Sequence, residues 1–465
     1  MYTVEWSKLR YYIGNILYMI GLAQIVPFIA SIILGESIIF STILGLSALI
    51  LVGIAWFIKR DIPAPPEISL ADAYIVTTIA FLVPAITCAI PIMAYGVDPL
   101  NALFEGVSAI TTTGLSALPK QALTPGVQFL RAYYQWLGGV SIALIVVSFL
   151  LTPGSSAYNI YLAHLGRYKL TPLSISTIKI ILKIYVFFTI IFTITYVLTG
   201  LPLFDSIINA LTTISTGGFS TLEEFRGNVM YAGMVLMFIS AQPLALYYFL
   251  FRGKTRDILN DPQLRSFTII TIASYLIIIL LTDVLKPEYL FQVISALSTT
   301  GYSALDNASL PDSLKFLFSM LMIMGAGFGS TGGGIKQLRV YLFLKSIIHS
   351  LKKQVLPSKA VSHVKISGHI VSDAEITQVH NLILIYMLVL VFSVLIIASY
   401  GYNLADSLFE CSSALATTGL SVGLSSPSLQ PIPKIVLIIN MFLGRLEIVP
   451  VLITLFKIFH FEKGK

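Results

Sequence analysis

Long apolar stretches separated by short polar connections recur along the whole chain. Ten of them are near or above the ~20 residues that a helix needs to cross a bilayer, and they lie at 11–34, 38–58, 72–95, 127–151, 174–199, 229–251, 267–285, 313–347, 378–400 and 432–459. The eighth is too long for one simple helix, and its middle is rich in glycine. The pattern predicts an all-α polytopic membrane protein.

Four semi-apolar segments that are too short to cross stand between these spans, at 101–112, 205–216, 288–299 and 406–417. Each runs into a related hexapeptide: TTTGLS at 111–116, STGGFS at 215–220, STTGYS at 298–303 and ATTGLS at 416–421. The shared glycines are Gly114, Gly218, Gly301 and Gly419. A short re-entrant helix followed by an extended segment is therefore predicted four times.

The four copies also agree at fixed distances before the shared glycine. Thirteen residues before it stand Asn101, Asp205, Glu288 and Asp406, of which three are N-cap types and the glutamate suits a first helical turn. Nine residues before it stand Glu105, Asn209, Gln292 and Glu410, and six before it stand Ser108, Thr212, Ser295 and Ser413. Such agreement indicates one unit used four times.

We expect an N-terminal two-helix segment and four pore-loop units in a pseudo-four-fold arrangement. Each unit consists of a spanning helix, a re-entrant helix, an extended segment and a second spanning helix. The expected boundaries are 1–64 for the N-terminal pair, then 65–152, 153–256, 257–350 with the glycine-rich stretch, and 351–465.

Composition and charge support a membrane protein. The chain is 56% hydrophobic and only 11% charged, whereas a soluble protein carries about 25% charged residues. Of the 29 basic residues, 22 fall in alternate connections, from Lys8 and Arg10 to the tail after Lys457. The positive-inside rule places these connections and both termini in the cytoplasm, so the net charge of +7 needs no nucleic-acid partner. The four hexapeptides then face outward.

The repeated unit has the physical properties of a cation site. A short helix that ends inside the membrane directs its C-terminal carbonyls, which carry partial negative charge, toward the membrane centre. The extended residues that follow must line protein or a water-filled cavity, and four such segments around one axis would offer rings of carbonyl oxygens in place of hydration water. One copy alone is typical of an ordinary turn, but four copies on one side of the membrane favour an ion selectivity filter.

The predicted filter residues are those around each shared glycine, because glycine permits the backbone that turns a carbonyl toward the axis. They are Thr111, Thr112, Thr113, Gly114, Ser215, Thr216, Gly217, Gly218, Ser298, Thr299, Thr300, Gly301, Ala416, Thr417, Thr418 and Gly419. The ion would be held by the backbone of all of these except Thr111, Ser215, Ser298 and Ala416.

The glycine-rich stretch within the eighth span should be unwound, because each glycine costs a helix about 1 kcal/mol relative to alanine. The candidate gate residues are Gly325, Gly327, Gly329, Ser330, Thr331, Gly332, Gly333, Gly334 and Lys336. The stretch contains a G-x-G-x-x-G match, but the βαβ unit that a dinucleotide site needs is missing. The alternative is a kink that allows close helix packing.

Arg445 lies midway along the last span, where a charge is expensive and usually lines a cavity or has a partner. A buried salt bridge is the alternative, although Glu447 is too near in sequence to share its face fully. Lys336 would anchor the glycine-rich stretch or lie at the cytoplasmic lip. Glu105 and Glu410 would either hold the re-entrant helices by hydrogen bonds or add negative potential near the filter.

On these residues the sequence resembles the Trk/Ktr/HKT superfamily of cation transporters, and most closely its TrkH/TrkG-type potassium uptake subunits. The four repeats carry the resemblance, together with GAGFGSTGGGIKQLR at 325–339 and GRLEIVPVL at 444–452. It implies potassium as the transported ion, no cofactor in this chain, and a multi-pass protein of the cell membrane. It also implies a homodimer and a cytoplasmic, nucleotide-binding regulatory subunit of the TrkA/KtrA type.

The resemblance assigns roles to the candidate residues. The glycine-rich stretch would be a loop across the pore that acts as a gate, and Arg445 would lie near the pore axis as a barrier to cations. Within the superfamily a serine in place of the first repeat's glycine goes with sodium transport, so Gly114 favours potassium. Each repeat here keeps one shared glycine, with a second only at Gly217, whereas tetrameric potassium channels carry a longer Thr-Val-Gly-Tyr-Gly signature.

Two other classes of protein are less consistent with the sequence. An ion-coupled secondary transporter shows two inverted repeats, whereas the four copies here are parallel. An intramembrane enzyme would need a catalytic constellation, and no H-E-x-x-H motif occurs. The polar connection 345–377 contains His349, His363 and His369, but their spacing fits no standard zinc pattern. This connection would dock a regulatory protein or serve as a linker.

Overall fold

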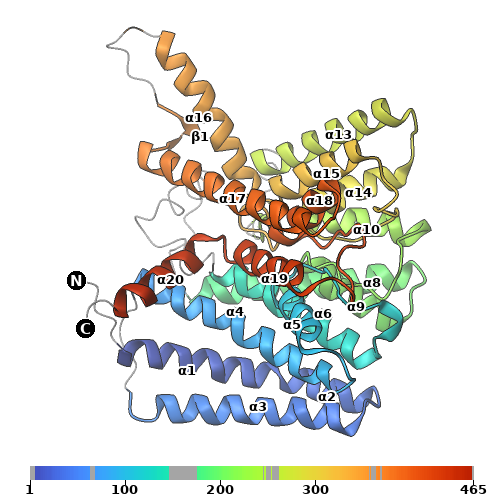
Figure 1. The fold of residues 1–465 in the computed structure, drawn as a ribbon, viewed down its shortest axis with the longest axis vertical. Coiled ribbons are helices and arrows are strands. Elements are labelled where there is room, and N and C mark those ends of the chain that lie inside the picture. The colour runs from blue at the N-terminus through green and yellow to red at the C-terminus, as the bar shows by residue number, and fades with distance from the viewer. Residues whose placement is uncertain are drawn as a thin grey trace.

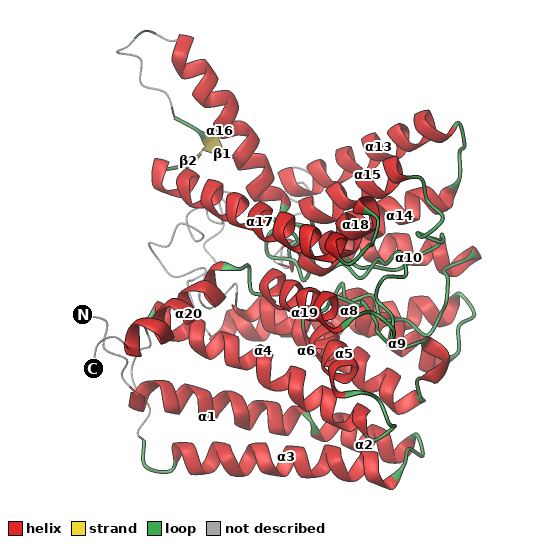
Figure 2. Ribbon diagram, viewed as in Figure 1, coloured by secondary structure: helices red, strands yellow, loops and turns green. Residues whose placement is uncertain are grey.

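The computed structural model describes residues 6–62, 69–145, 175–244, 246–247, 253, 261–355, 357, 363–366 and 369–462. These residues form helices joined by loops, apart from one antiparallel pair of two-residue strands, β1 (Lys365–Ile366) and β2 (His369–Ile370). Figure 2 shows this helical architecture, with irregular segments gathered at the centre of the molecule. The prediction of an all-α polytopic membrane protein is confirmed.

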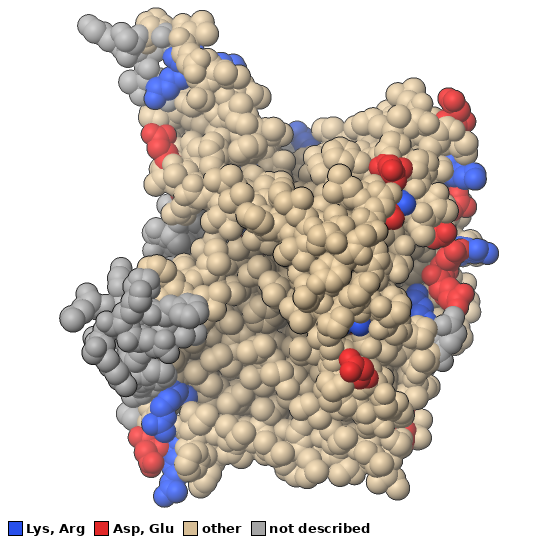
Figure 3. All heavy atoms as spheres, in the orientation of Figure 1, with Lys and Arg blue, Asp and Glu red and all other residues tan. Residues whose placement is uncertain are grey.

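Six described helices are long and apolar enough to cross a membrane, or seven if one bent pair is counted as a single span. The six are Lys8–Ile33, Ile38–Lys59, Asp72–Met93, Lys179–Leu198, Pro262–Thr282 and Asp373–Ser399. In Figure 3 the charged side chains lie mostly along two opposite edges, and the broad face between them is largely free of charge. That face has the composition expected of a surface in contact with lipid.

The N-terminal part is a helical hairpin that stands beside the rest of the molecule (Figure 1). It consists of α1 (Trp6–Ala23), α2 (Ile25–Ile33) and α3 (Ile38–Lys59). The side chain of Gln24, between α1 and α2, donates a 2.7 Å hydrogen bond to Ser47 Oγ of α3. The hairpin packs against α4 (Leu70–Met93), the first helix of the remaining part.

The remaining helices follow one order four times: a long helix, a short helix and a second long or medium helix. The bounds are α4 (Leu70–Met93), α5 (Pro99–Ile110) and α6 (Pro125–Ile145); α8 (Ile175–Leu198), α9 (Leu203–Ile214) and α10 (Gly227–Ser240); α13 (Pro262–Thr282), α14 (Pro287–Ser298) and α15 (Asp312–Met324); and α17 (Asp373–Ser399), α18 (Leu404–Leu415) and α19 (Pro431–Arg445). The 3₁₀ turn η1 (Lys120–Ala122) lies between α5 and α6.

The caps of the short helices differ from the sequence prediction. Asp98 caps α5 and Asn403 caps α18 through their side chains, whereas Pro202 and Lys286 occupy the same position before α9 and α14. The three N-cap candidates, Asn101, Asp205 and Asp406, lie inside the first turn instead, and Glu288 lies in the first turn as expected. Their positions suit the positive end of the helix dipole, but they are not N-caps.

Two predicted spans are broken. The eighth, 313–347, divides into α15 and α16 (Gln337–Val355) at the glycine-rich stretch. The tenth, 432–459, divides into α19 and α20 (Val449–Glu462), which are bent by 103°. The prediction of one continuous helix at 432–459 is therefore wrong. Glu447 and Ile448 adopt left-handed φ angles of 57° and 60° at the break, although neither residue type favours that conformation.

Some sequence predictions fall outside the described residues. Parts of the predicted spans 127–151 and 229–251, and residues 356, 358–362 and 367–368 of the connection 345–377, belong to this group. So do eight of the basic residues used for the orientation: Arg167, Lys169, Arg252, Lys254, Arg256, Lys359, Lys463 and Lys465.

Candidate functional site

The four short helices end in the same unusual way. A threonine with a left-handed backbone follows within two residues of each helix end: Thr112 (φ 51°), Thr216 (φ 52°), Thr299 (φ 55°) and Thr417 (φ 50°). It is the C-cap of α14 and the first residue after the C-cap of α5, α9 and α18. Glycine normally occupies this position, and a β-branched residue there is strained. Nothing in the threonine side chain signalled this conformation in the sequence, and only the fourfold recurrence could have suggested it.

Backbone hydrogen bonds hold each of these helix ends. The residue after the left-handed threonine donates its N–H to the carbonyl oxygen of the residue five positions earlier, for example Thr113 to Ser108 at 2.9 Å and Thr418 to Ser413 at 2.8 Å. Together with the bonds made by the threonine N–H groups, this is the hydrogen-bond pattern of a Schellman motif. In the first and fourth copies the serine hydroxyl also accepts the N–H of the shared glycine, Gly114 or Gly419, at 3.0 Å.

The four shared glycines form a closed ring, which we call the glycine ring. All four have positive φ, between 78° and 96°. A Cβ atom on Gly114 would overlap the carbonyl oxygen of Gly217 in the second copy. In the same way, an added Cβ atom would overlap the carbonyl oxygen of Thr300 at Gly218, that of Thr418 at Gly301, and that of Thr113 at Gly419. The four extended segments therefore lie side by side in chain order and return to the first.

Exposure distinguishes the glycines from their neighbours. The predicted filter side chains of Thr111–Thr113, Ser215–Thr216, Ser298–Thr300 and Ala416–Thr418 are at most 1% exposed. The shared glycines that follow these residues are partly exposed: Gly114, Gly218, Gly301 and Gly419. The ring thus combines a buried outer layer with an accessible glycine in each segment.

The polar residue nine before each glycine braces the segment that follows the ring. In all four copies it contacts the serine two residues after the glycine. The pairs are Glu105 with Ser116 (2.8 Å), Asn209 with Ser220 (2.7 Å), Gln292 with Ser303 (3.3 Å) and Glu410 with Ser421 (2.8 Å). Glu105 also accepts the Ala117 N–H at 2.7 Å. These contacts agree with the first of the two roles considered for the glutamates, which is to hold the re-entrant unit by hydrogen bonds.

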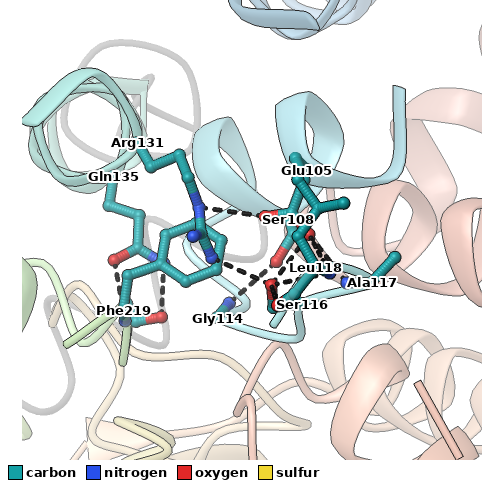
Figure 4. Close-up of polar contacts among 10 residues, drawn as sticks. Glu105, Ser108, Gly114, Ser116, Ala117, Leu118, Arg131, Gln135 and Phe219 are labelled. Atoms are coloured by element: carbon teal, nitrogen blue, oxygen red, sulfur yellow. Dashed lines mark hydrogen bonds and ion pairs between the residues drawn. The ribbon is translucent and has the colours of Figure 1, made fainter. Parts of the chain in front are cut away.

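The first copy differs from the fourth because its glutamate has a cationic partner. Arg131 of α6 forms a 2.9 Å ion pair with Glu105, and both side chains are buried (Figure 4). The same guanidinium lies 3.7 Å from the centre of the Phe219 ring, which belongs to the second copy. Glu410 instead receives hydrogen bonds from serine hydroxyls and backbone N–H groups, including Val422 N at 3.1 Å and Ser425 N at 3.0 Å.

The glycine-rich loop, which we define as residues 325–336 between α15 and α16, lies against the ends of three short helices. Thr331 Oγ1 donates to the carbonyl oxygen of Ile214 at the end of α9, at 2.9 Å. The N–H of Gly333 donates to Thr299 Oγ1 after α14, at 2.7 Å. A Cβ atom on Gly333 would overlap the carbonyl oxygen of Ala416 after α18. The loop therefore packs directly beside the glycine ring.

Arg445 connects the glycine-rich loop to the first copy. Its guanidinium donates to the carbonyl oxygens of Thr331, at 2.7 Å, and of Gly138 in α6, at 2.8 Å. The nearby Glu447 pairs instead with Arg339 of α16, at 2.6 Å. Arg445 thus bonds two backbone carbonyls, and the described ion pair at this place belongs to Glu447 and Arg339.

Two further candidate residues stabilise the glycine-rich loop from within. The Lys336 ammonium donates to the carbonyl oxygen of Gly332, and its backbone has φ 80°. Ser330 Oγ donates to the carbonyl oxygen of Gly327 at 2.7 Å. The Gly327–Gly332 motif follows the helix α15 rather than a strand. Among the described residues, no group of three His, Cys, Asp or Glu side chains is placed to hold a metal ion.

A family model with the description "TrkH: Cation transport protein" matches residues 40–286 and 287–463. An uncharacterized cation transporter of Methanocaldococcus jannaschii is 30% identical, over 97% of this chain and 95% of its own length. The Trk system potassium uptake protein TrkH of Halomonas elongata and the protein TrkG of Escherichia coli are each 27% identical, over 95% of this chain and 96% of theirs.

A solved structure has the same fold. The potassium transporter TrkH from Vibrio parahaemolyticus superimposes with a TM-score of 0.85, over 97% of this chain and 98% of that one, at 24% identity. This likeness concerns the fold alone. The family model and the M. jannaschii relative extend the likeness to sequence over nearly the full length.

Proposed function

The chain belongs to the TrkH family of cation transport proteins, and from that premise we propose that it takes up potassium ions across the cell membrane through a channel-like pore. The prediction of a transport protein rather than an enzyme is confirmed by the family. Curated relatives are named as potassium uptake proteins of the Trk system, which supports potassium as the ion. Potassium is then the transported ligand, and the chain itself carries no cofactor.

The observation that carries the proposal is the closure of the glycine ring. Four helix ends and four extended segments meet there, so that carbonyl groups with partial negative charge converge from four sides. The partly exposed glycines mark where an ion would reach the ring. The proposed ligands are backbone oxygens at Thr112, Thr113, Gly114, Thr216, Gly217, Gly218, Thr299, Thr300, Gly301, Thr417, Thr418 and Gly419, which replace hydration water.

In this proposal the glycine-rich loop and Arg445 form the gate. The loop touches the ends of α9, α14 and α18, and Arg445 joins it to α6, so all four copies contact one element. The contacts are a few hydrogen bonds and one close steric approach. The loop has six glycines within ten residues, and such a segment has more than one accessible backbone conformation. Displacement of the loop would open the path below the ring.

The four units at 65–152, 153–256, 257–350 and 351–465 are proposed to be the pore repeats, and both termini are proposed to be cytoplasmic. Arg339, Lys345 and the other basic residues of α16 support a cytoplasmic position of this helix, because the positive-inside rule favours basic residues on that side. In Figure 1, α16 projects away from the body of the molecule. We propose that a homodimer and a cytoplasmic nucleotide-binding subunit of the TrkA/KtrA type assemble on this side.

Flux measurements with the purified chain in liposomes test the proposal. We expect potassium and rubidium to enter faster than sodium, down their gradients and without a coupling ion. A variant that lacks several residues of the glycine-rich loop should be measured in parallel, so that a closed gate is not mistaken for an absent pore. Absence of flux in both proteins would reject the pore, and dependence of potassium entry on a sodium or proton gradient would favour an ion-coupled transporter.

A further inference from the structure

Gln135 and Gly217 are two departures from the fourfold pattern, and they contact each other. Gln135 is the eleventh residue of α6, and the eleventh residues of α10, α15 and α19 are Met237, Met322 and Met441. All four side chains are 0% exposed. One copy therefore has a buried amide where the other three have a buried thioether.

Neighbouring glycines support the alignment of Gln135 in α6 with Met441 in α19. Gly138 stands three residues after Gln135, and Gly444 stands three residues after Met441. A Cβ atom on Gly138 would overlap the carbonyl oxygen of Ile110, and one on Gly444 would overlap that of Leu415. Ile110 and Leu415 are the last residues of α5 and α18. Gln135 and Met441 thus occupy the same place in their repeats.

Gly217 is the matching departure within the ring. The residue before the shared glycine is Thr113, Thr300 or Thr418 in three copies and Gly217 in the second. The backbone does not require glycine here, because Gly217 is not among the glycines with positive φ. The Gln135 amide fills the space beside it instead, since a Cβ atom on Gly217 would overlap that amide and displace it.

The Gln135 amide makes two hydrogen bonds to the ring segment of the second copy. Its nitrogen donates to the carbonyl oxygen of Gly217, and its oxygen accepts the N–H of Phe219 at 3.2 Å (Figure 4). A carbonyl can only accept and an N–H can only donate, so these two partners fix the orientation of the amide. The two bonds flank Gly218, the shared glycine of this copy.

We propose that Gln135 is a positioning residue that holds the second ring segment and so sets the preference between potassium and sodium, an inference that rests on the proposed function. Gly217 and Gly218 are consecutive glycines, and without restraint this segment would have more backbone freedom than the other three. The amide removes that freedom. It also gives the Gly217 carbonyl an N–H donor, whereas within the described chain no side chain donates to the carbonyls of Thr113, Thr300 or Thr418.

Three variants test the proposal: Gln135→Met, Gly217→Thr, and the two combined, which recreates the methionine–threonine combination of the other copies. Each single variant should lower the ratio of potassium to sodium flux in liposomes about fivefold, because Gln135→Met removes both hydrogen bonds to the ring segment and Gly217→Thr displaces the amide that makes them. The double variant should return to within about twofold of the wild-type ratio, because such a pair is strongly non-additive. Gln128→Met is the control, since this amide on the same helix donates to the Leu123 carbonyl outside the ring.

A second measurement does not depend on transport. Hydrogen–deuterium exchange of peptides covering 215–220 should be faster in Gln135→Met than in the wild type, because the Phe219 N–H loses its acceptor. Flux ratios that stay within about twofold of the wild type in Gln135→Met, or single-variant effects that multiply in the double variant, would overturn the role in selectivity. Should the wild type carry no cation at all, the proposed function fails, while unchanged exchange would separately refute the positioning role.

Discussion

Arg445 donates a 2.7 Å hydrogen bond to the carbonyl oxygen of Thr331, and this bond joins the broken last span to the glycine-rich loop. Thr331 in turn donates through its hydroxyl to the carbonyl of Ile214 at the end of α9. The end of α19, the glycine-rich loop and the short helix α9 are therefore connected through Thr331. A movement of the loop must break or rearrange both bonds.

Two substitutions of Arg445 should distinguish the effect of its charge on flux from the effect of its hydrogen bonds. Arg445→Gln removes the charge and should raise potassium flux about tenfold, equivalent to about 1.4 kcal/mol off a barrier. Arg445→Lys keeps the charge but cannot form the same fork to two carbonyls, so an intermediate rise is expected. Flux into liposomes measures both variants. Equal flux in Arg445→Gln and the wild type would remove Arg445 from the gate.

Shortening the glycine-rich loop should raise flux without changing ion preference. Deletion of several residues within 325–334 removes the contacts to Ile214, Thr299 and Ala416 while leaving the glycine ring intact. Potassium and rubidium uptake should both increase, with an unaltered ratio between them. A deletion variant that folds normally and conducts like the wild type would contradict the gate.

Gly114→Ser should shift the preference from potassium toward sodium. The serine Cβ would overlap the Gly217 carbonyl oxygen, so the ring must widen or lose its regular order at that point. Gly423→Ala is a matched control, because Gly423 has a similar φ of 89° but no atom within 4 Å of an added Cβ. Permeability ratios measured by flux should change in the first variant only. The same change in both would assign the effect to backbone strain.

The two buried glutamates should differ in their contribution to stability. Glu105→Gln leaves Arg131 buried without its ion-pair partner, and we expect a loss of about 3 kcal/mol. Glu410→Gln loses hydrogen-bond acceptors but leaves no cation unpaired, so a loss of about 1 to 2 kcal/mol is expected. Thermal unfolding in detergent ranks the two variants. The reverse order would show that the Glu105–Arg131 pair is not stabilising in its membrane setting.

A cytoplasmic regulatory partner should co-purify with the full-length chain from its native membrane. Substitution of exposed lysines of α16, such as Lys352 and Lys353 near its C-terminal end, should weaken that association. Raising the ionic strength should weaken the association of the wild-type chain in the same way, because salt screens exposed charges. Pull-down at several salt concentrations is the measurement. Regulation that is complete with the chain alone in liposomes would argue against such a partner.

The repeated glycines could be located from the sequence because their spacing recurs four times and each copy supports the others. The unwound loop at 325–336 was equally readable, since six glycines within ten residues disfavour a helix. The left-handed threonines were not, because threonine has no preference for that conformation and tertiary contacts impose it. The break after Arg445 was hidden for the same reason, as Glu447 and Ile448 are ordinary helix residues by type.

Gln135 shows another limit of reading the sequence. A glutamine among apolar residues of a long helix carries no signal of its partner, which lies 82 positions away. Its meaning depends on knowing which helix of one repeat faces which segment of the next. That information is in the packing. Gly217 is visible in the sequence as an extra glycine. The reason for it is visible only in the structure, where the Gln135 amide occupies the space that a side chain at position 217 would need.

All four segments of the glycine ring belong to one polypeptide, so a single substitution alters one segment and leaves the other three unchanged. In a channel assembled from identical subunits, every such change is made four times at once. In the proposed pore, the contribution of each of the four segments to ion passage can thus be measured separately, one substitution at a time.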